Sequence, residues 1–232
     1  MLEMQHLYVY SETQIGGKTM KKKIVSLVAI VILVLSGCSI GQSAEKQLSE
    51  TLNKMNESET EYRDTQSKLT ELEKEEQKTF TETMELTKED VDKLSSKIDE
   101  LESLLDERLA LIDQEEAAMK KAGEFVKELD AIAEKASDSG SGKIVELKDA
   151  AEKRYDLHSA FIGEYKKLAE MQKEFYSMLS AEDVELDDLK QKVGEVNEQN
   201  AIVQTAIAEF NEATKKVNTL KEEVFSSFEH EE

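Results

Sequence analysis

The single cysteine of this 232-residue chain, Cys38, is the residue whose type and position point most clearly to a chemical reaction. Three lysines, Lys21 to Lys23, precede an uncharged apolar run from Ile24 to Leu35, and two small residues then lead into the cysteine. A positive segment, a short apolar segment and a small-residue cleavage zone form the layout of a secretory signal. The apolar run has about 12 residues, fewer than the roughly 20 that a helix needs to span a bilayer. The pattern therefore predicts export and cleavage rather than a permanent membrane span.

The tetrapeptide Leu35-Ser36-Gly37-Cys38 resembles the lipobox of bacterial lipoproteins. That resemblance implies transfer of a diacylglyceryl group to the Cys38 sulfur and cleavage between Gly37 and Cys38. The thiol is the nucleophile that accepts the lipid, and small residues fit the cleft of the signal peptidase. Two acyl chains, at ~0.8 kcal/mol per buried CH₂, give stable membrane anchoring. The expected location is the outer face of the cytoplasmic membrane, facing the cell wall; the alternative is an ordinary signal sequence with an incidental cysteine.

The chain divides into four expected parts around this cysteine. Residues 1–19 include acidic side chains that are unfavourable in a signal sequence, and residues 15–20 can be back-translated into a ribosome-binding site followed by ATG. We therefore expect residues 1–19 to be a mis-annotated upstream extension, with Met20 as the true start. Residues 20–37 are the expected signal peptide, residues 38–43 a lipidated tether, and residues 44–232 a single helical domain.

Outside Cys38, no group of residues predicts a reaction. His6 and His230 lie near the chain ends, and His158 is isolated beside an apolar stripe, where a hydrogen-bonded core histidine is the ordinary interpretation. The chain has neither the Glu-x-x-His motifs of di-iron bundles nor a Gly-rich phosphate loop. We therefore predict no catalytic residue, cofactor or metal ligand. With 51 acidic and 30 basic residues, the net charge of −21 would repel nucleic acid and other polyanions.

The composition predicts an all-α fold made of long helices. The chain has no Pro and no Trp, and 35% of its residues are charged. The first helix is expected from Ala44 to about Phe80, with an apolar stripe that Glu59 and Gln66 interrupt. The apolar residues of this stripe are Leu48, Leu52, Met55, Tyr62, Leu69 and Leu72.

A heptad repeat gives the second helix, expected over residues 91–136, the clearest periodicity in the chain. Apolar side chains occupy the a and d positions, and Arg108 and Glu115 are the two exceptions. The apolar a and d residues are Val91, Leu94, Ile98, Leu101, Leu105, Ile112, Met119, Ala122, Val126, Leu129 and Ala133. A 3.5-residue repeat sustained over this length predicts a left-handed supercoil.

The remaining sequence predicts two further helices and the connections between them. Residues 137–142, Ser-Asp-Ser-Gly-Ser-Gly, are expected to form a loop that reverses the chain before a third helix over residues 143–179. The fourth helix is expected over residues 184–228, and Thr87 and Ser180 are expected to begin capping boxes. The predicted fold is an elongated antiparallel up-down bundle of four long helices with coiled-coil-like packing. If residues 79–86 form only a kink, three helices result.

Polar residues on the apolar stripes form a separate set. We expect one or two buried polar layers made from Arg108, Glu115, His158, Asn200 and Thr214. Such layers fix the register and pairing of helices at some cost in stability, as a buried Asn does in coiled coils. The alternative is a polar groove that binds a peptide or a glycan.

The run from Phe210 to Lys221, FNEATKKVNTLK, resembles the F-N-x-x-T-x-x-Y-N-x-x-K pattern of the YkyA family, whose members are described as cell-wall-binding lipoproteins of Gram-positive bacteria. Val217 stands where the pattern has Tyr. The resemblance implies a long helical bundle on the outer face of the membrane. The matched polar residues, which share roughly one helix face and are expected to be a polar seam or a binding site, are Asn211, Thr214, Asn218 and Lys221.

Together these patterns predict a membrane-anchored, non-catalytic binding or scaffold module between the membrane and the wall. The expected partner is peptidoglycan or another envelope protein. One alternative is a cell-envelope enzyme such as a wall hydrolase, which would need a pocket with convergent acid and base groups. Another is a precursor whose signal peptide, ending at Gly37, yields a secreted pheromone.

Overall fold

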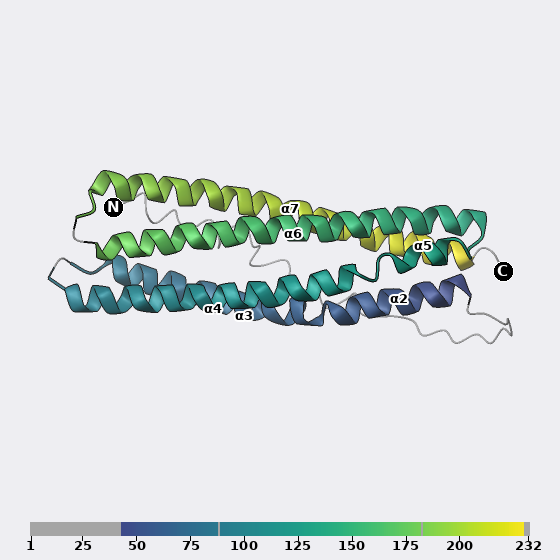
Figure 1. Cartoon of the computed structure of the whole chain (residues 1–232), viewed down its shortest axis with the longest axis horizontal. Coiled ribbons are helices and arrows are strands. Elements are labelled where there is room, and N and C mark those ends of the chain that lie inside the picture. Colours follow the sequence, from purple (N-terminus) through teal and green to yellow (C-terminus); the bar gives the residue numbers. More distant parts are fainter. Residues whose placement is uncertain (1–42, 88, 182, 230–232) are drawn as a thin grey trace. The chain divides into compact units, whose positions relative to one another are not determined.

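The computed structural model describes residues 43–229, apart from residues 88 and 182. The predictions for residues 1–42, which include the upstream extension, the signal peptide, Cys38 and most of the tether, lie outside the described residues, as do His6 and His230. The described chain contains only helices and their connections. These helices are α2 (Ala44–Ser58), α3 (Thr60–Met84), α4 (Val91–Gly123), α5 (Glu128–Ala133), α6 (Asp138–Ser180) and α7 (Leu186–Glu229) (Figure 1). None of them is both long enough and apolar enough to cross a membrane.

The helices form an antiparallel four-helix bundle, as the sequence predicts. Helix one consists of α2 and α3, helix two of α4 and α5, and α6 and α7 are each continuous (Figure 1). The most extensive helix–helix packing joins α6 with α7, α3 with α4, and α4 with α6. The three-helix alternative is wrong because α3 and α4 pack side by side as a hairpin instead of continuing as one helix.

The heptad predicted for helix two is confirmed by burial. Ile98, Leu101, Leu105 and Ile112 are at most 4% exposed, and the apolar positions from Met119 to Ala133 are also buried. Val91 is the clear exception, because it is the first residue of α4 and is 65% exposed. Continuous a and d positions therefore face the bundle interior through α4 and α5.

The loop predicted over residues 137–142 is wrong from residue 138 onward. Residues 138–142 are the first turns of α6, because the Ser137 side chain caps the helix by accepting a hydrogen bond from the Gly140 N–H at 3.3 Å. Gly140 serves a packing role, since a Cβ at this position would lie 3.3 Å from the Phe228 ring of α7. The reversal between helix two and α6 is correspondingly shorter than predicted.

Neither predicted capping box caps a helix. The Thr87 hydrogen bonds form, since the Asp90 carboxylate accepts the Thr87 N–H at 3.3 Å and the Thr87 hydroxyl accepts the Glu89 N–H at 3.4 Å. They lie in the turn before α4, whose N-cap is Asp90 without a side-chain capping hydrogen bond, so the prediction that Thr87 caps the helix start is wrong. The Ser180 box is wrong, because Ser180 is the last residue of α6 and its hydroxyl donates to the Ser177 carbonyl at 2.9 Å. Accordingly α7 begins at Leu186, two residues later than expected.

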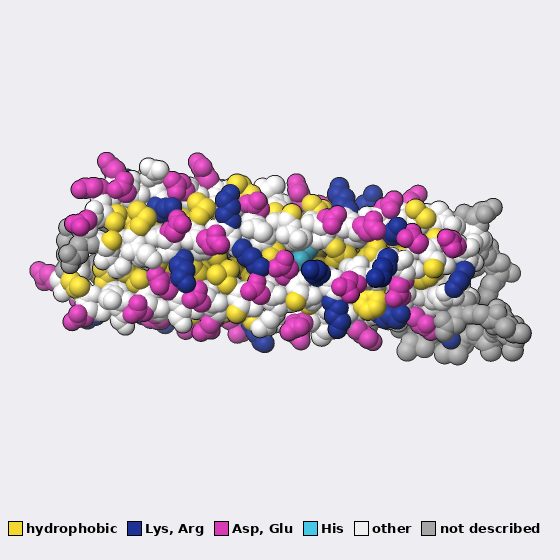
Figure 2. All heavy atoms as spheres, in the orientation of Figure 1, with side chains coloured by type: hydrophobic (Ala, Val, Ile, Leu, Met, Phe, Trp, Pro, Cys, Tyr) yellow, Lys and Arg dark blue, Asp and Glu magenta, His cyan; other side chains and the backbone are white. Residues whose placement is uncertain are grey.

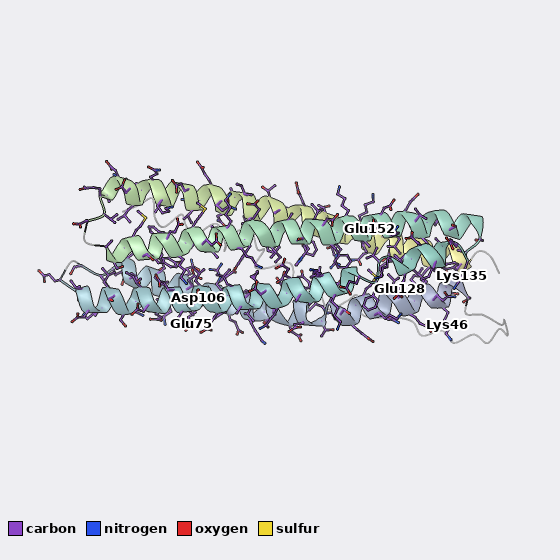
Figure 3. All side chains as sticks on the ribbon, viewed as in Figure 1. Lys46, Glu75, Asp106, Glu128, Lys135 and Glu152 are labelled. Carbon is purple, nitrogen blue, oxygen red and sulfur yellow. The ribbon has the colours of Figure 1, made fainter. Side chains whose placement is uncertain are left out.

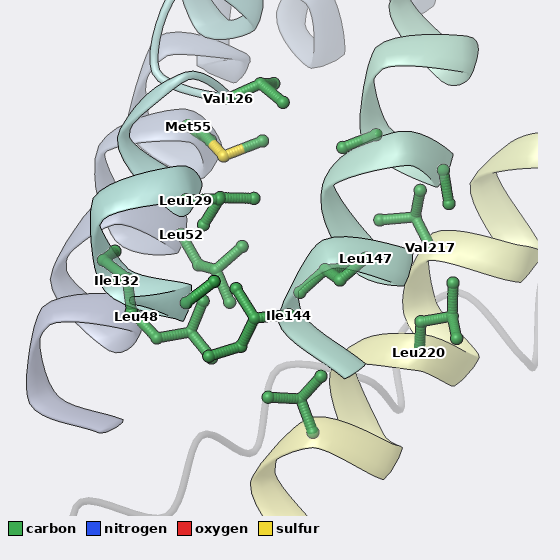
Figure 4. Close-up of a cluster of buried hydrophobic side chains, with 14 residues drawn as sticks. Leu48, Leu52, Met55, Val126, Leu129, Ile132, Ile144, Leu147, Val217 and Leu220 are labelled. Carbon is green, nitrogen blue, oxygen red and sulfur yellow. The ribbon is translucent and has the colours of Figure 1, made fainter. Parts of the chain in front are cut away.

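One end of the bundle has an apolar core, which we call the end core (Figure 4). It joins side chains of α2, the α5 region, the start of α6 and the last third of α7. Its members are Leu48, Leu52, Met55, Val126, Leu129, Ile132, Ala133, Ile144, Leu147, Ala150, Ala151, Val217, Leu220 and Val224. This core holds together the end of the bundle at which α2 begins.

Charged side chains, most of them acidic, are scattered over the face seen in Figure 2, with apolar side chains between them. Many are paired between neighbouring helices. Lys54 of α2 bonds Glu128 of α5 at 3.1 Å, and Lys173 of α6 bonds Asp106 of α4 at 2.7 Å. The acidic members of these pairs, Glu128 and Asp106, are labelled in Figure 3. Exposed pairs of this kind each contribute roughly 0–1 kcal/mol, so they accompany the packing rather than determine it.

Candidate functional site

Helix one breaks at Glu59, between α2 and α3. The Glu59 backbone, at φ −81° and ψ 5°, leaves the regular helical path. Arg63 replaces part of the lost helical hydrogen bonding, since its guanidinium donates to the Asn56 carbonyl at 3.0 Å and to the Asn56 side-chain oxygen at 3.1 Å. The Arg63 side chain therefore stabilises the break between α2 and α3.

Helix two breaks after Gly123. The backbone tightens there into i→i−3 hydrogen bonds, as when the Phe125 N–H donates to the Ala122 carbonyl at 3.2 Å and the Val126 N–H to the Gly123 carbonyl at 3.1 Å. A Cβ on Gly123 would lie 3.3 Å from the Tyr155 ring of α6. Glycine thus allows the ring to lie against the backbone at this break.

Two adjacent residues of α6, Arg154 and Tyr155, connect these breaks. Arg154 donates to both carboxylate oxygens of Glu59, at 2.7 and 3.0 Å, and to the Thr214 hydroxyl of α7 at 2.9 Å. The Tyr155 hydroxyl donates to the same Glu59 carboxylate at 2.5 Å. We call Glu59, Arg154, Tyr155 and Thr214 the break layer, because it joins both breaks to α6 and α7.

Burial and the Glu59 charge shift the pKa values of Arg154 and Tyr155 in the break layer. Burial opposes the charge of Arg154, but the hydrogen bond and negative charge of Glu59 raise the pKa of its guanidinium. Burial and the Glu59 charge both raise the pKa of Tyr155 far above its ordinary value. A bidentate arginine–carboxylate pair of this kind is a strong and geometrically specific contact.

A second layer, the histidine layer, lies deeper in the bundle. His158 Nε2 lies 2.8 Å from one oxygen of Glu115, and the Gln66 amide donates to the other oxygen at 2.6 Å. Glu115 is fully buried and His158 is 2% exposed. The His158 ring packs edge-on against Tyr62 and Phe210, with centroid distances of 5.7 and 5.2 Å. Burial and the Glu115 charge raise the pKa of Tyr62 to about 12.

A third layer, the arginine layer, surrounds Arg108. Its guanidinium pairs with the fully buried Glu76 and donates to the Tyr165 hydroxyl at 2.6 and 3.0 Å. The Tyr176 hydroxyl donates to the other Glu76 oxygen at 2.6 Å, and the Tyr165 hydroxyl donates to Glu73 at 2.9 Å. Each charged group in this layer therefore has a directed partner.

The prediction of buried polar layers is confirmed for Arg108, Glu115 and His158, which are buried, whereas Thr214 is half-buried. Arg108, Glu115, His158 and Thr214 belong to the three layers, and Asn200 does not. Asn200 is half-buried, and its neighbour Gln199 instead contacts α6 by donating to the Glu164 carboxylate at 2.6 Å.

The sequence reasoning missed Glu76, Arg154 and the role of Tyr176. A usable signal was present on helix one, where Glu59, Gln66 and Glu73 recur every seven residues and each contacts one of the layers. The same interval separates Arg108 from Glu115. A seven-residue polar repeat on facing helices marks stacked layers in a bundle with 3.5-residue periodicity.

The four residues matched to the C-terminal pattern occupy two environments. Thr214 is half-buried in the break layer, and Lys221 is half-buried near it. Asn211 and Asn218 are exposed on α7. Burial, together with the positive charge of Arg154, lowers the pKa of Lys221, although Glu59 acts in the opposite direction.

The carboxylates of the three layers hydrogen-bond to other side chains of the bundle. Their partners are arginine, histidine, glutamine or tyrosine side chains, and no metal-binding group of three or more His, Cys, Asp or Glu side chains occurs in the described part of the chain.

Comparison with known proteins decides the family: the model of the family described as "Putative cell-wall binding lipoprotein" matches residues 43–227. This chain belongs to the YkyA family.

The YkyA match confirms the resemblance drawn from the C-terminal run. The fold is similar to a 1.6 Å crystal structure of a conserved protein of unknown function from Staphylococcus aureus, with a TM-score of 0.70 and 21% sequence identity. The likeness covers 81% of this chain and 98% of that one, and at this identity it concerns the fold alone. No curated protein matches the chain.

Proposed function

We propose that this YkyA-family protein is a lipid-anchored, non-catalytic binding module that stands between the cytoplasmic membrane and the cell wall. The observation that carries the proposal is the family match over residues 43–227, which begins just after the Leu35-Ser36-Gly37-Cys38 sequence. A diacylated Cys38 would supply the two acyl chains that stable anchoring needs. The helical bundle would then be joined to the membrane anchor by only a few residues.

The chain geometry supports an outward-facing role for the far end of the bundle. Four residues separate Cys38 from Ser43, so the Cα atoms of these two residues are at most about 18 Å apart. From there α2 and α3 run to Met84, and α6, with 43 residues, has a length of about 65 Å. An anchor at Cys38 would therefore hold the start of α2 near the membrane and extend the connections at residues 85–90 and 181–185 toward the wall.

The interior polar groups support binding rather than catalysis. A catalytic carboxylate or histidine must reach its substrate, directly or through one water. Glu115 and His158 are at most 2% exposed, and both Glu115 oxygens contact side chains of the bundle. The exposed surface is thus the part of the molecule available to a partner.

The surface charge favours a partner of low charge density. A net charge of −21 disfavours polyanions, whereas peptidoglycan and envelope proteins can present neutral amide and hydroxyl groups. We propose peptidoglycan or an envelope protein as the partner, as the family description suggests for the wall.

Co-sedimentation separates these partners. The full-length protein is incubated with purified wall sacculi and, separately, with a membrane extract, each at low and high salt. Retention by sacculi identifies the wall, and retention of one protein from the extract identifies an envelope partner. The double variant Val91→Ser with Leu186→Ser replaces two exposed apolar side chains at the far end of the bundle, where α4 and α7 begin. If retention of this variant falls, the contact lies at the far end. Retention by neither preparation would contradict the proposed binding role.

A further inference from the structure

A groove lies between α2 and the short helix α5, which pack against each other at the end of the bundle that holds the end core. We call it the α2–α5 groove. Its volume is about 290 Å³, close to the lower limit of small-ligand pockets, ~300 Å³. Thr51 and Ile132 line it and are each only 3% exposed, and Ile132 belongs to the end core. The base of the groove therefore consists of well-packed side chains.

Hydrogen bonds between the two helices fix the polar side chains of the groove. Glu128 of α5 accepts the Thr51 hydroxyl at 3.0 Å and the Lys54 ammonium at 3.1 Å, both through Oε2. Lys135 of α5 donates to the side-chain oxygen of Gln47 of α2 at 2.7 Å. These contacts hold polar groups of both helices in place before a ligand arrives.

The Lys54–Glu128 pair keeps hydrogen-bonding capacity for a ligand. Within the described residues, Oε2 is the only Glu128 side-chain oxygen that a hydrogen bond reaches, so Oε1 can accept another. The Lys54 ammonium donates to Glu128 and lies 5.7 Å from the centroid of the Phe125 ring, which leaves it further N–H donors. The two side chains are 50% and 36% exposed. An acceptor and donors thus lie side by side where a ligand can reach them.

The charges around the groove balance, although the chain as a whole carries a net charge of −21. Glu50, Glu128 and Lys54 line the groove, and Lys135 bonds one of its walls. The groove therefore has no net charge that would select an ion. A hydroxyl group both donates and accepts hydrogen bonds, which suits a carboxylate oxygen beside an ammonium group. A sugar ring also has an apolar C–H face, which suits apolar side chains at the base.

We propose that the α2–α5 groove binds a short neutral saccharide. A sugar hydroxyl donates to Glu128 Oε1 and accepts from Lys54, and the C–H face of the ring packs on Ala131 and Ile132, which line the groove. The site deepens the proposed wall binding, because it names the glycan as the part of the wall that is recognised. It rests on the proposed function only for the source of the saccharide.

Saturation-transfer NMR with the full-length protein tests the groove. The probes are N,N′-diacetylchitobiose and cellobiose, and saturation should pass from the protein to the ring protons of at least one of them. Lys54→Met and Glu128→Met should each raise the dissociation constant about tenfold, because each removes a charged hydrogen-bonding group. The matched control Lys173→Met breaks an exposed pair between α4 and α6 and should leave the dissociation constant unchanged.

A filled groove separates ligand binding from a structural role of the Lys54–Glu128 pair. Ala131 is exposed, so Ala131→Phe adds a ring at the groove without changing the core, and it should abolish saturation transfer. Ala208→Phe, at an exposed position of α7, is the matched control and should retain the transfer. Melting temperatures within a few degrees of the wild type establish that both variants fold.

Two results would overturn the saccharide site. One is the absence of transfer to both disaccharides from the wild type, and the other is undiminished transfer from Ala131→Phe. Co-sedimentation with wall sacculi then separates the site from the proposed function. Equal retention of the wild type and Ala131→Phe would contradict glycan recognition by the groove and leave wall binding intact. Saccharide binding without retention by sacculi would contradict wall binding and leave the groove intact.

Discussion

The two regions of the bundle on either side of the helix breaks differ in the side chains that fill their interiors. At the end where α2 begins, α2, α5 and the adjoining parts of α6 and α7 are joined through the apolar end core. Beyond the breaks, the arginine and histidine layers place charged and polar groups among apolar side chains that are also buried, such as Leu101, Leu105 and Phe175. Apolar packing provides stability with little directional preference, whereas buried polar groups penalise every register that leaves them unpaired. The comparison indicates that the polar layers specify which helix faces pair, while buried apolar side chains stabilise both regions.

Loss of one partner from the arginine layer should have the largest effect. Arg108→Met leaves the fully buried Glu76 carboxylate without its cation, so the free energy of unfolding should fall by about 4 kcal/mol in urea denaturation. Adding Glu76→Met should recover most of that loss, because the unpaired charge is removed. The control Lys173→Met breaks an exposed pair and should change stability by less than about 1 kcal/mol. Equal losses for Arg108→Met and the control would remove the distinction between the regions.

Truncation within the end core should have the next largest effect. Leu129 is fully buried, so Leu129→Ala should lower the free energy of unfolding by about 3 kcal/mol through lost burial and a cavity. Hydrogen exchange should speed up first in α2 and α5, on the near side of the breaks. Val145→Ala, at a position 43% exposed, is the matched control and should be nearly neutral. Uniform acceleration along all helices would show that the two regions unfold as one.

High pH should selectively destabilise the region beyond the breaks through Tyr62. Its pKa is about 12 in the folded chain, against 10.0 for the ordinary side chain, so between these pH values the folded state retains a proton that the unfolded state has lost. Stability is therefore lost as pH rises through this window, by about 2 kcal/mol relative to Tyr62→Phe, which has no phenol to titrate. Parallel pH profiles for the wild type and Tyr62→Phe would contradict this assignment.

Weakening the break layer should have the smallest effect. Glu59→Gln retains the shape of the side chain but removes the charge that Arg154 and Tyr155 contact, so we expect a loss of about 1 to 2 kcal/mol in urea denaturation. The exposed Glu57→Gln, on the same helical turn, is the matched control and should be neutral. A neutral Glu59→Gln would mean that the breaks are held by backbone geometry alone.

Much of the fold was predictable from the sequence because the heptad of helix two is strict, and the same regularity made Arg108 and Glu115 visible as exceptions. Their partners were not predictable. One buried glutamate such as Glu76 cannot be told from the exposed glutamates beside it until α6 supplies Tyr176. The break at Glu59 also has no Gly or Pro to mark it. Residues 138–142 were predicted as a loop because their glycines suggest turns, whereas the Ser137 cap and the Phe228 contact make them helical.

The central functional claim is that Cys38 carries lipid and holds the bundle outside the cell. The direct measurement is intact mass spectrometry of the protein from the membrane fraction of its host, compared with a Cys38→Ser variant. We predict a wild-type chain that begins at Cys38, carries a diacylglyceryl mass and remains with the membrane, while the variant lacks the lipid. A wild-type protein recovered from the aqueous fraction with an unmodified thiol would contradict the account.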